Sequence, residues 1–218
     1  MILLLAVIIG LAATLVRARL THRTLIMPHI HWEWLVFVSV VPQILAFNVP
    51  YTARLIPDDL IPAIQIFSMS GLIIFAMVNV FLPGFWVLLA GLLSNFIVIL
   101  LNGGWMPISM ETVRQISPSR PDDFWTIGDR LGFTKDRIFS ASDINLPWLS
   151  DRFTLPPGLP QNLAFSVGDI IISIGAIFLL WSLSREEKRR KDDTHTFIND
   201  KNSGDSAADV RSTCVHEI

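Results

Sequence analysis

The sequence predicts an all-α membrane protein, a five-helix transmembrane bundle with one long outer loop. Five apolar runs, at residues 1–16, 32–47, 60–82, 85–101 and 163–183, are long enough or nearly long enough to cross a bilayer. Hydrophobic residues are 51% of the chain and charged residues 17%, and the mean hydropathy of +0.51 is high for a soluble domain. In lipid a helix satisfies its own backbone hydrogen bonds while apolar side chains face the lipid tails.

The first apolar run, residues 1–16, is expected to remain as a helix rather than to act as a secretory signal. A signal peptide carries its basic residues before the apolar run, whereas here Arg17, Arg19 and Arg23 come after it. This order favours a retained helix with its N-terminus outside.

Basic residues also predict the orientation of the whole chain. With five crossings, Arg17, Arg19 and Arg23 lie on the same side as the basic cluster in residues 185–191, and the positive-inside rule identifies that side as cytoplasmic. The chain has no Asn-x-Ser/Thr acceptor site, which fits a bacterial membrane. We therefore expect a multi-pass protein of the bacterial cytoplasmic (inner) membrane, with the N-terminus outside and the C-terminus in the cytoplasm.

These runs divide the chain into four parts. Residues 1–101 hold four transmembrane helices, and residues 163–184 form the fifth. Between them, residues 102–162 form an extracytoplasmic loop that is expected to pack on the outer membrane face, with a short helix at 109–116. Residues 185–218 are basic and then polar, and we expect a disordered cytoplasmic tail.

Tryptophans stand at the ends of the predicted spans, where an aromatic belt anchors helices at the membrane surface. They are Trp32, Trp34, Trp86, Trp105 and Trp181. We expect an anchoring role for all five.

Asp169 is the only ionisable side chain well inside a predicted span. One interpretation is a carboxylate that binds a proton, a cation or a substrate near the outer face. The other is a helix cap, because Ser166, Gly168 and Asp169 lead directly into an isoleucine run. We expect the cap, so that these three residues form the entry of the last helix.

Asn79 and Asn95 are polar residues on two neighbouring antiparallel spans. Small residues, Gly71, Gly91 and Ser94, lie near them. Interhelical hydrogen bonding and close packing account for these residues without catalysis.

Cofactor and metal ligands are scarce. A haem or chlorophyll-type pigment in a helix bundle needs an imidazole ligand, and no histidine lies inside an apolar run. The histidines are His22, His29, His31, His195 and His216. The cofactor is therefore unknown, and His29-x-His31 is too weak a pattern to predict a metal site. The single thiol, Cys214, excludes an internal disulfide.

The densest local signal is Asn102-Gly103-Gly104-Trp105-Met106-Pro107, at the outer end of the fourth run. The two glycines permit backbone conformations closed to other residues, and Asn102 can cap the preceding helix. We expect a rigid helix-exit turn made by Asn102, Gly103, Gly104, Met106 and Pro107. The alternative is a backbone-lined pocket with Asp169 close by.

This turn, the Ser166–Asp169 entry and the Trp-Leu-Ser-Asp stretch at 148–151 resemble a family of small bacterial integral membrane proteins of unknown function with an Asn-Gly-Gly-x-Met-Pro motif. The resemblance covers most of residues 1–184 and leaves the tail outside. It implies the membrane architecture and no established activity.

Two functions from different classes fit this sequence. The first is a non-catalytic accessory or scaffold subunit of a larger membrane complex, an energy-transducing complex being one option. The second is a membrane-embedded enzyme or carrier that acts on a lipid-linked or small substrate through Asp169 and the Asn102-Gly103-Gly104 turn. The sequence contains no catalytic motif and leans towards the first. The expected partners of such a protein are the bilayer and other membrane protein subunits. A net charge of −2 gives no electrostatic support to a nucleic-acid partner.

Overall fold

The computed structural model describes residues 2–21, 24–25, 28–121, 123–155 and 163–185. Helices make up 59% of this part, with seven α-helices, so the prediction of a mostly helical protein is confirmed. The expectations for the tail from residue 186 onward, with His195, Cys214 and His216, lie outside the described residues, as do those for His22 and Arg23.

Each of the five apolar runs forms a helix. They are α1 (Ile2–Leu20), α2 (Trp34–Gln43) continued by the π-helix η1 (Ile44–Asn48), α4 (Ile61–Val78), α5 (Phe85–Leu101) and α7 (Val167–Ser182). Among the described residues, the helical stretch Asp58–Val78 is long and apolar enough to cross a membrane. Shorter apolar helices are Trp34–Asn48, Phe85–Leu101 and Val167–Ser182.

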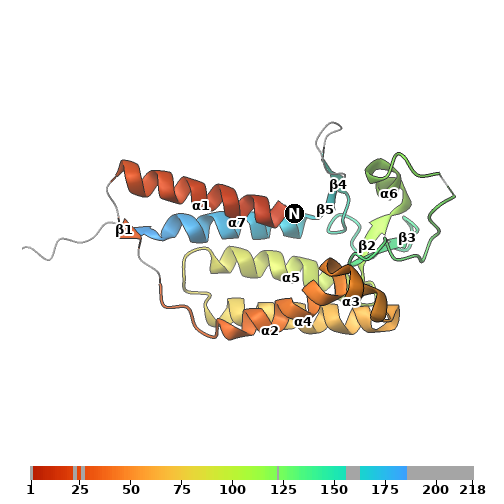
Figure 1. Cartoon of the computed structure of the whole chain (residues 1–218), viewed down its shortest axis with the longest axis horizontal. Helices are drawn as coiled ribbons and strands as arrows, with labels where there is room; N and C mark the ends of the chain where they lie inside the picture. Colours follow the sequence, from red (N-terminus) through yellow and green to blue (C-terminus); the bar gives the residue numbers. More distant parts are fainter. Residues whose placement is uncertain (1, 22–23, 26–27, 122, 156–162, 186–218) are drawn as a thin grey trace, which may run out of the picture. The chain divides into compact units, whose positions relative to one another are not determined.

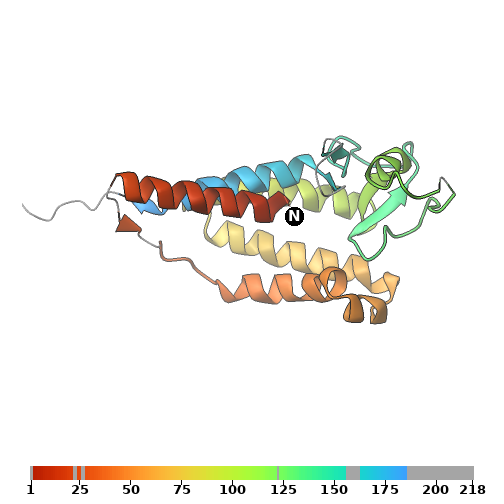
Figure 2. The same cartoon turned by 45° about the horizontal axis from the view of Figure 1, so that its top comes forward.

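These helices pack in the order α1–α7–α5–α4–α2, and helices that follow one another along the chain run in opposite directions (Figures 1 and 2). One end of the row, the loop end, carries α3 (Pro50–Leu55), the 3-10 helix η2 (Asp58–Leu60) and the segment between α5 and α7. The opposite end, the short-turn end, carries the link from α1 to α2 and the α4–α5 turn. The short strands β1 (Thr24–Leu25) and β6 (Ser184–Arg185) follow α1 and α7.

Small residues let the helices approach closely. On α1, Ala6, Gly10 and Thr14 repeat every four residues and are all buried, and a Cβ added to Gly10 would lie 3.2 Å from the Cα of Ile177 on α7. The contact between α1 and α7 therefore depends on the absence of large side chains along this seam.

Glycines play the same part between the other helices. A Cβ on Gly91 of α5 would lie 2.8 Å from the backbone nitrogen of Ile172, and one on Gly175 of α7 would lie 2.7 Å from that of Leu88. The expected packing role of Gly91 thus corresponds to a backbone-to-backbone approach. Gly71 of α4 instead packs against the side chain of Ser39 on α2, which leaves no room for a Cβ at Gly71.

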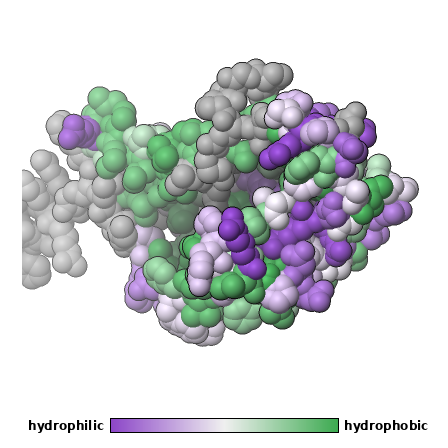
Figure 3. Space-filling view, turned by 45° about the vertical axis from the view of Figure 1, so that its right-hand side comes forward, coloured by the Kyte–Doolittle hydropathy of each residue, from purple (hydrophilic) through white to green (hydrophobic). Residues whose placement is uncertain are grey.

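Large apolar side chains are exposed along the outward faces of the row. Examples are Ile8 on α1, Phe37 on α2, Phe67 on α4, Ile97 on α5 and Ile174 on α7, each between 45% and 69% exposed. In Figure 3 the hydrophilic residues gather instead on the side of the molecule where the loop end lies.

Residues 102–166, the loop unit, contain strands that the all-α prediction did not include. Strand β2 (Met106–Ser109) pairs in parallel with β3 (Asp136–Phe139), and β4 (Phe153–Thr154) pairs with β5 (Ala164–Phe165) in the antiparallel sense. The predicted short helix is α6 (Met110–Ile116), capped by Ser109. A small core of Ile108, Val113 and Ile138 joins these elements.

Two details were not expected from the sequence. The apolar run at 32–47 was predicted as one helix, but Pro42 inside α2 cannot donate a backbone hydrogen bond, and the helix continues after it as the wider η1. Trp105 is only 4% exposed and packs with Ala46 and Ile61, so it is a core residue and not a membrane-surface anchor. By contrast, Trp34 is 58% exposed.

Candidate functional site

The Asn102 turn ends α5 and starts the loop unit. The Nδ2 group of Asn102 donates to the carbonyl oxygens of Val98 (2.7 Å) and Asn145 (3.0 Å), and its Oδ1 accepts from the backbone nitrogen of Asn145 (2.9 Å). Asn145 in turn donates to the carbonyl of Leu101. Asn102 therefore caps the helix and also fastens a distant part of the loop unit to it.

Both glycines of the turn have left-handed backbone, with φ of +71° at Gly103 and +86° at Gly104. They differ in the space around them. No atom lies within 4 Å of a Cβ added to Gly103, whereas one added to Gly104 would lie 2.9 Å from the Cα of Pro62 on α4. Gly104 is required both for its backbone angle and for the approach of α4.

The remaining residues of the motif are buried. Met106 lies in a cluster with Met69, Val98, Ile99 and Leu149, and it has no exposed surface. Pro107 is also fully buried, and its carbonyl accepts from the backbone nitrogen of Asp151 at 3.2 Å. The motif therefore directs the chain from α5 into the core of the loop unit.

At the entry of α7, Ser166 is the N-cap and Asp169 is the third helical residue. The Ser166 hydroxyl accepts from the Asp169 backbone nitrogen (3.1 Å), and Asp169 Oδ2 accepts from the Ser166 backbone nitrogen (3.1 Å), which completes a capping box. The Asp169 carboxylate thus satisfies a backbone donor at the start of the helix.

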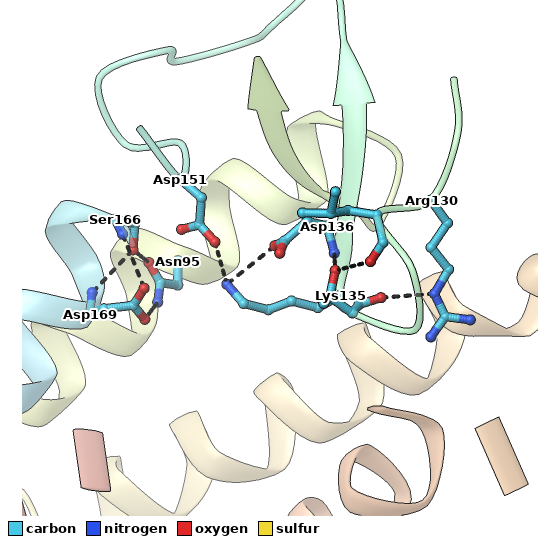
Figure 4. A network of polar contacts seen from close by, with 9 residues as sticks. Asn95, Arg130, Lys135, Asp136, Asp151, Ser166 and Asp169 are labelled. Carbon is cyan, nitrogen blue, oxygen red and sulfur yellow. Dashed lines mark hydrogen bonds and ion pairs between the residues drawn. The ribbon is translucent and has the colours of Figure 1, made fainter. Parts of the chain in front are cut away.

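Asn95 of α5 joins this cap from the neighbouring helix (Figure 4). Its Nδ2 donates to Asp169 Oδ1 (3.0 Å), and its Oδ1 accepts from the Ser166 hydroxyl (2.9 Å). Gly168 packs against Asn95 with no room for a side chain. The interhelical bonds of Asn95 therefore run to α7, and none of the described residues' bonds joins Asn95 to Asn79.

Asn79 has a separate role at the short-turn end, where it caps α4. Its Nδ2 donates to the carbonyls of Phe75 (2.9 Å) and His31 (2.8 Å), and its Oδ1 accepts from the His31 backbone nitrogen (2.8 Å). It ties the segment before α2 to the end of α4. His31 uses only its backbone here, while its ring stacks edge-on against His29.

Lys135 lies among carboxylates, close to the Ser166–Asp169 capping box and Asn95 (Figure 4). No pattern in the sequence predicted a role for this lysine. Lys135 Nζ lies 2.9 Å from Asp151 Oδ2 and 3.7 Å from Asp136 Oδ1. The Asp151 side chain is 2% exposed and that of Lys135 is 36% exposed. The Oδ1 atoms of Asp151 and Asp136 are buried without a hydrogen-bond partner among the described residues.

These charged groups shift each other's pKa values. Burial alone would lower the pKa of Lys135, but the negative charges of Asp151, Asp136 and Asp169 raise it above its ordinary value. Burial raises the pKa of Asp151 well above its ordinary value, and the attraction of Lys135 opposes this rise. Lys135 therefore stays charged, and its positive charge offsets the negative charges of Asp151 and Asp136 in the loop unit and of Asp169 on α7.

Arg130 fastens the loop unit to the opposite side of the helix row. Its side chain is 5% exposed, and its guanidinium donates to the carbonyls of Thr134, Phe133 and Ala46. It also pairs with Asp58 at 3.1 Å. A charged residue in a polar loop gives no sequence signal for such a buried position.

A pocket of about 700 Å³ opens beside the Asn102 turn. Asn102, Gly103, Arg137, Asp59 and Asp143 are among the residues that line it, and Asp169 is not. The turn and Asp169 thus do not share this pocket. Among the described residues, no group of three or more His, Cys, Asp or Glu side chains is placed to hold a metal ion.

These features define a mostly helical protein with a folded loop unit fastened to one end of its helix row. The chain belongs to the family of unknown function DUF5317, whose model matches residues 28–181. The match includes both the Asn102 turn and the entry of α7. No curated protein and no solved structure matches the chain.

Replacing Asp169 by asparagine is expected to lower stability moderately. Asparagine has one carbonyl oxygen, whereas the carboxylate accepts separately from Ser166 and from Asn95. The loss should be about 1–2 kcal/mol, measured as a lower thermal midpoint in detergent micelles. With Asn95→Ala the loss should be non-additive because the two side chains bond to each other. Full additivity would show that this bond contributes nothing.

Proposed function

We propose that the chain is a five-span integral membrane protein that acts as a non-catalytic accessory or scaffold subunit of a larger membrane complex. The observation that carries the membrane placement is the exposure of large apolar side chains along every helix of the row. In water this surface would drive aggregation, whereas in lipid it is the expected outer surface of the bundle. The small-residue seams at Gly10, Gly71 and Gly91 add support, because membrane helices associate through such close contacts.

Helix length and direction support five crossings. At 1.5 Å per residue, α4, α5 and α7 are about 27, 25 and 24 Å long, close to the hydrocarbon thickness of about 30 Å. The alternating directions place the connections of the row on two opposite faces, as successive crossings require.

The position of basic residues supports the orientation, and tryptophans mark the membrane surface at the same end. Arg17 lies at the short-turn end, and its guanidinium stacks 4.4 Å from the ring of Trp181. Trp32, Trp34 and Trp86 are also at this end, and each is more than half exposed. Aromatic residues anchor helices at both membrane surfaces, whereas basic residues gather on the cytoplasmic side, so the position of Arg17 favours a loop unit that lies outside.

This orientation predicts opposite compartments for the loop unit and the tail. Reporter fusions at Asn145 and Lys201 should be active outside and inside the cytoplasm, respectively. A paired-reporter activity ratio in whole bacterial cells measures this. A cytoplasmic signal from the Asn145 fusion would overturn the orientation, and soluble fusions would overturn the membrane placement.

The accessory role is favoured because the residues that stand out in the sequence make structural contacts. Asn102 caps α5, Asp169 completes the cap of α7, and Gly104 gives α4 room, so each has a structural task. Purification in a mild detergent followed by mass analysis should therefore yield a defined set of co-purifying membrane proteins. A chain that purifies alone from its native membrane at every detergent concentration would contradict the accessory role.

The second candidate is an enzyme or carrier at the outer face, and the pocket beside Asn102 and Gly103 is the observation that favours it. Asp169→Asn separates the two. An accessory subunit should still assemble, because the cap is only weakened. A protein whose chemistry needs the carboxylate should stay folded and lose all cellular function.

A further inference from the structure

The pocket beside the Asn102 turn lies where the helix row meets the loop unit. Pro62 near the start of α4 and Leu101 at the end of α5 line its helical side, and residues of β3 line the other. With the membrane placement proposed above, on which this inference rests, this position corresponds to the level of the lipid headgroups at the outer face.

The charges of the pocket have both signs. Asp59 and Asp143 contribute two carboxylates, while the third one, Asp58, is paired with Arg130. Arg137 contributes the cation that lines the pocket: its Nε donates to the Gly128 carbonyl (2.7 Å) and its guanidinium stacks 5.2 Å from the ring of Trp105.

No carboxylate of the described residues lies within ion-pair distance of Arg137, so its outer nitrogens keep donors for a ligand. With Asp58 paired, the lining groups sum to about one negative charge. A ligand that carries an ammonium group as well as a phosphate would match this lining better than one that carries a phosphate alone.

An apolar stripe leads away from the pocket along α5. Leu101 lines the pocket and is 51% exposed, and Leu93, Ile97 and Leu100 are also exposed. Leu93, Ile97 and Leu101 follow one another at spacings of four residues and Leu100 lies seven residues after Leu93, so these side chains share one broad face of the helix. A hydrocarbon chain that starts at the pocket would lie along this face.

We propose that the pocket holds the headgroup of a zwitterionic phospholipid, with its phosphate at Arg137, its ammonium group at Asp59 and Asp143, and an acyl chain along the α5 stripe. The cavity volume of about 700 Å³ is sufficient for a headgroup of this kind. The loop unit would thereby be fixed on the membrane by a specific lipid as well as by its protein contacts.

To test this, the full-length protein is delipidated and then incubated with mixed micelles that contain equal amounts of phosphatidylethanolamine and phosphatidylglycerol. After re-isolation, the bound lipids are quantified by mass spectrometry. The wild-type protein should retain phosphatidylethanolamine over phosphatidylglycerol by about fivefold, the preference expected from two partly exposed ion pairs.

The variant Asp59→Asn/Asp143→Asn should lose this preference and bring the ratio close to one. The matched control, Glu33→Gln/Asp123→Asn, also removes two exposed carboxylates but leaves the pocket lining intact, so the ratio should stay near the wild-type value. A wild-type ratio of one, a preference for phosphatidylglycerol, or an unchanged ratio in the pocket variant would overturn the proposal. Release of the chain from membranes by alkaline carbonate would instead overturn the membrane placement itself.

Discussion

Replacing Gly104 by valine is expected to cost about 3–5 kcal/mol of folding stability, because two penalties add at this residue. The backbone angle φ of +86° is unfavourable for any residue with a Cβ, and most of all for a β-branched one. The new side chain would also collide with Pro62 and push α4 away from the turn. We expect a fall of roughly 6–20 °C in the thermal midpoint in detergent micelles, or no recoverable protein.

A matched pair of alanine variants separates these two penalties. Gly103→Ala meets the same backbone strain at φ +71° but open space, so it should cost only about 1–2 kcal/mol. Gly104→Ala adds the contact with the Cα of Pro62 and should cost clearly more. Equal losses at the two glycines would show that α4 does not approach the turn as closely as the structure has it.

The helices could be predicted because the signal for them is long and local. The run at residues 85–101 coincides with α5 (Phe85–Leu101), and the run at 60–82 contains α4 (Ile61–Val78). An apolar run determines a helix through its own residues, without knowledge of distant partners. The change from α2 to η1 after Pro42 was not predicted, because the form of such a change depends on the packing around it.

The loop unit could not be predicted in the same way. Strands β2 and β3 have four residues each, and their register pairs Met106 with Asp136, so neither strand carries a signal by itself. Hydrogen bonds between such distant segments depend on the whole fold of the loop.

The candidate site was predictable only where backbone geometry requires a particular residue. Gly103 and Gly104 stand out because few residues adopt left-handed backbone, and Ser166 stands out because helix starts favour serine. Lys135 and Arg130 look like ordinary solvated charges in sequence. The burial of Arg130, and the ion pair of Lys135 with the buried Asp151, become visible only when the loop unit is placed against the helices.

Replacing Arg130 by alanine is expected to loosen the loop unit from the α2 side of the row, at a cost of about 3 kcal/mol. Ala46 has no exposed surface and its carbonyl lies in the last turn of η1, and the residue four positions on is Pro50, which has no N–H to donate to it. Arg130 supplies that donor, so the alanine variant leaves a buried carbonyl without a partner. The thermal midpoint should fall by roughly 6–12 °C, and amide exchange should accelerate at residues 130–134.

Two further variants separate the ion pair of Arg130 from its hydrogen bonds to backbone carbonyls. Asp58→Asn should have little effect, below about 1 kcal/mol, because the Asp58 side chain is 65% exposed and its ion pair is screened by water. Arg130→Lys keeps the charge but lacks the planar fork that reaches Ala46, Phe133 and Thr134 together, so it should recover less than half of the loss. If Asp58→Asn proved as damaging as Arg130→Ala, the ion pair would be the fastening, and the backbone carbonyls would be incidental to it.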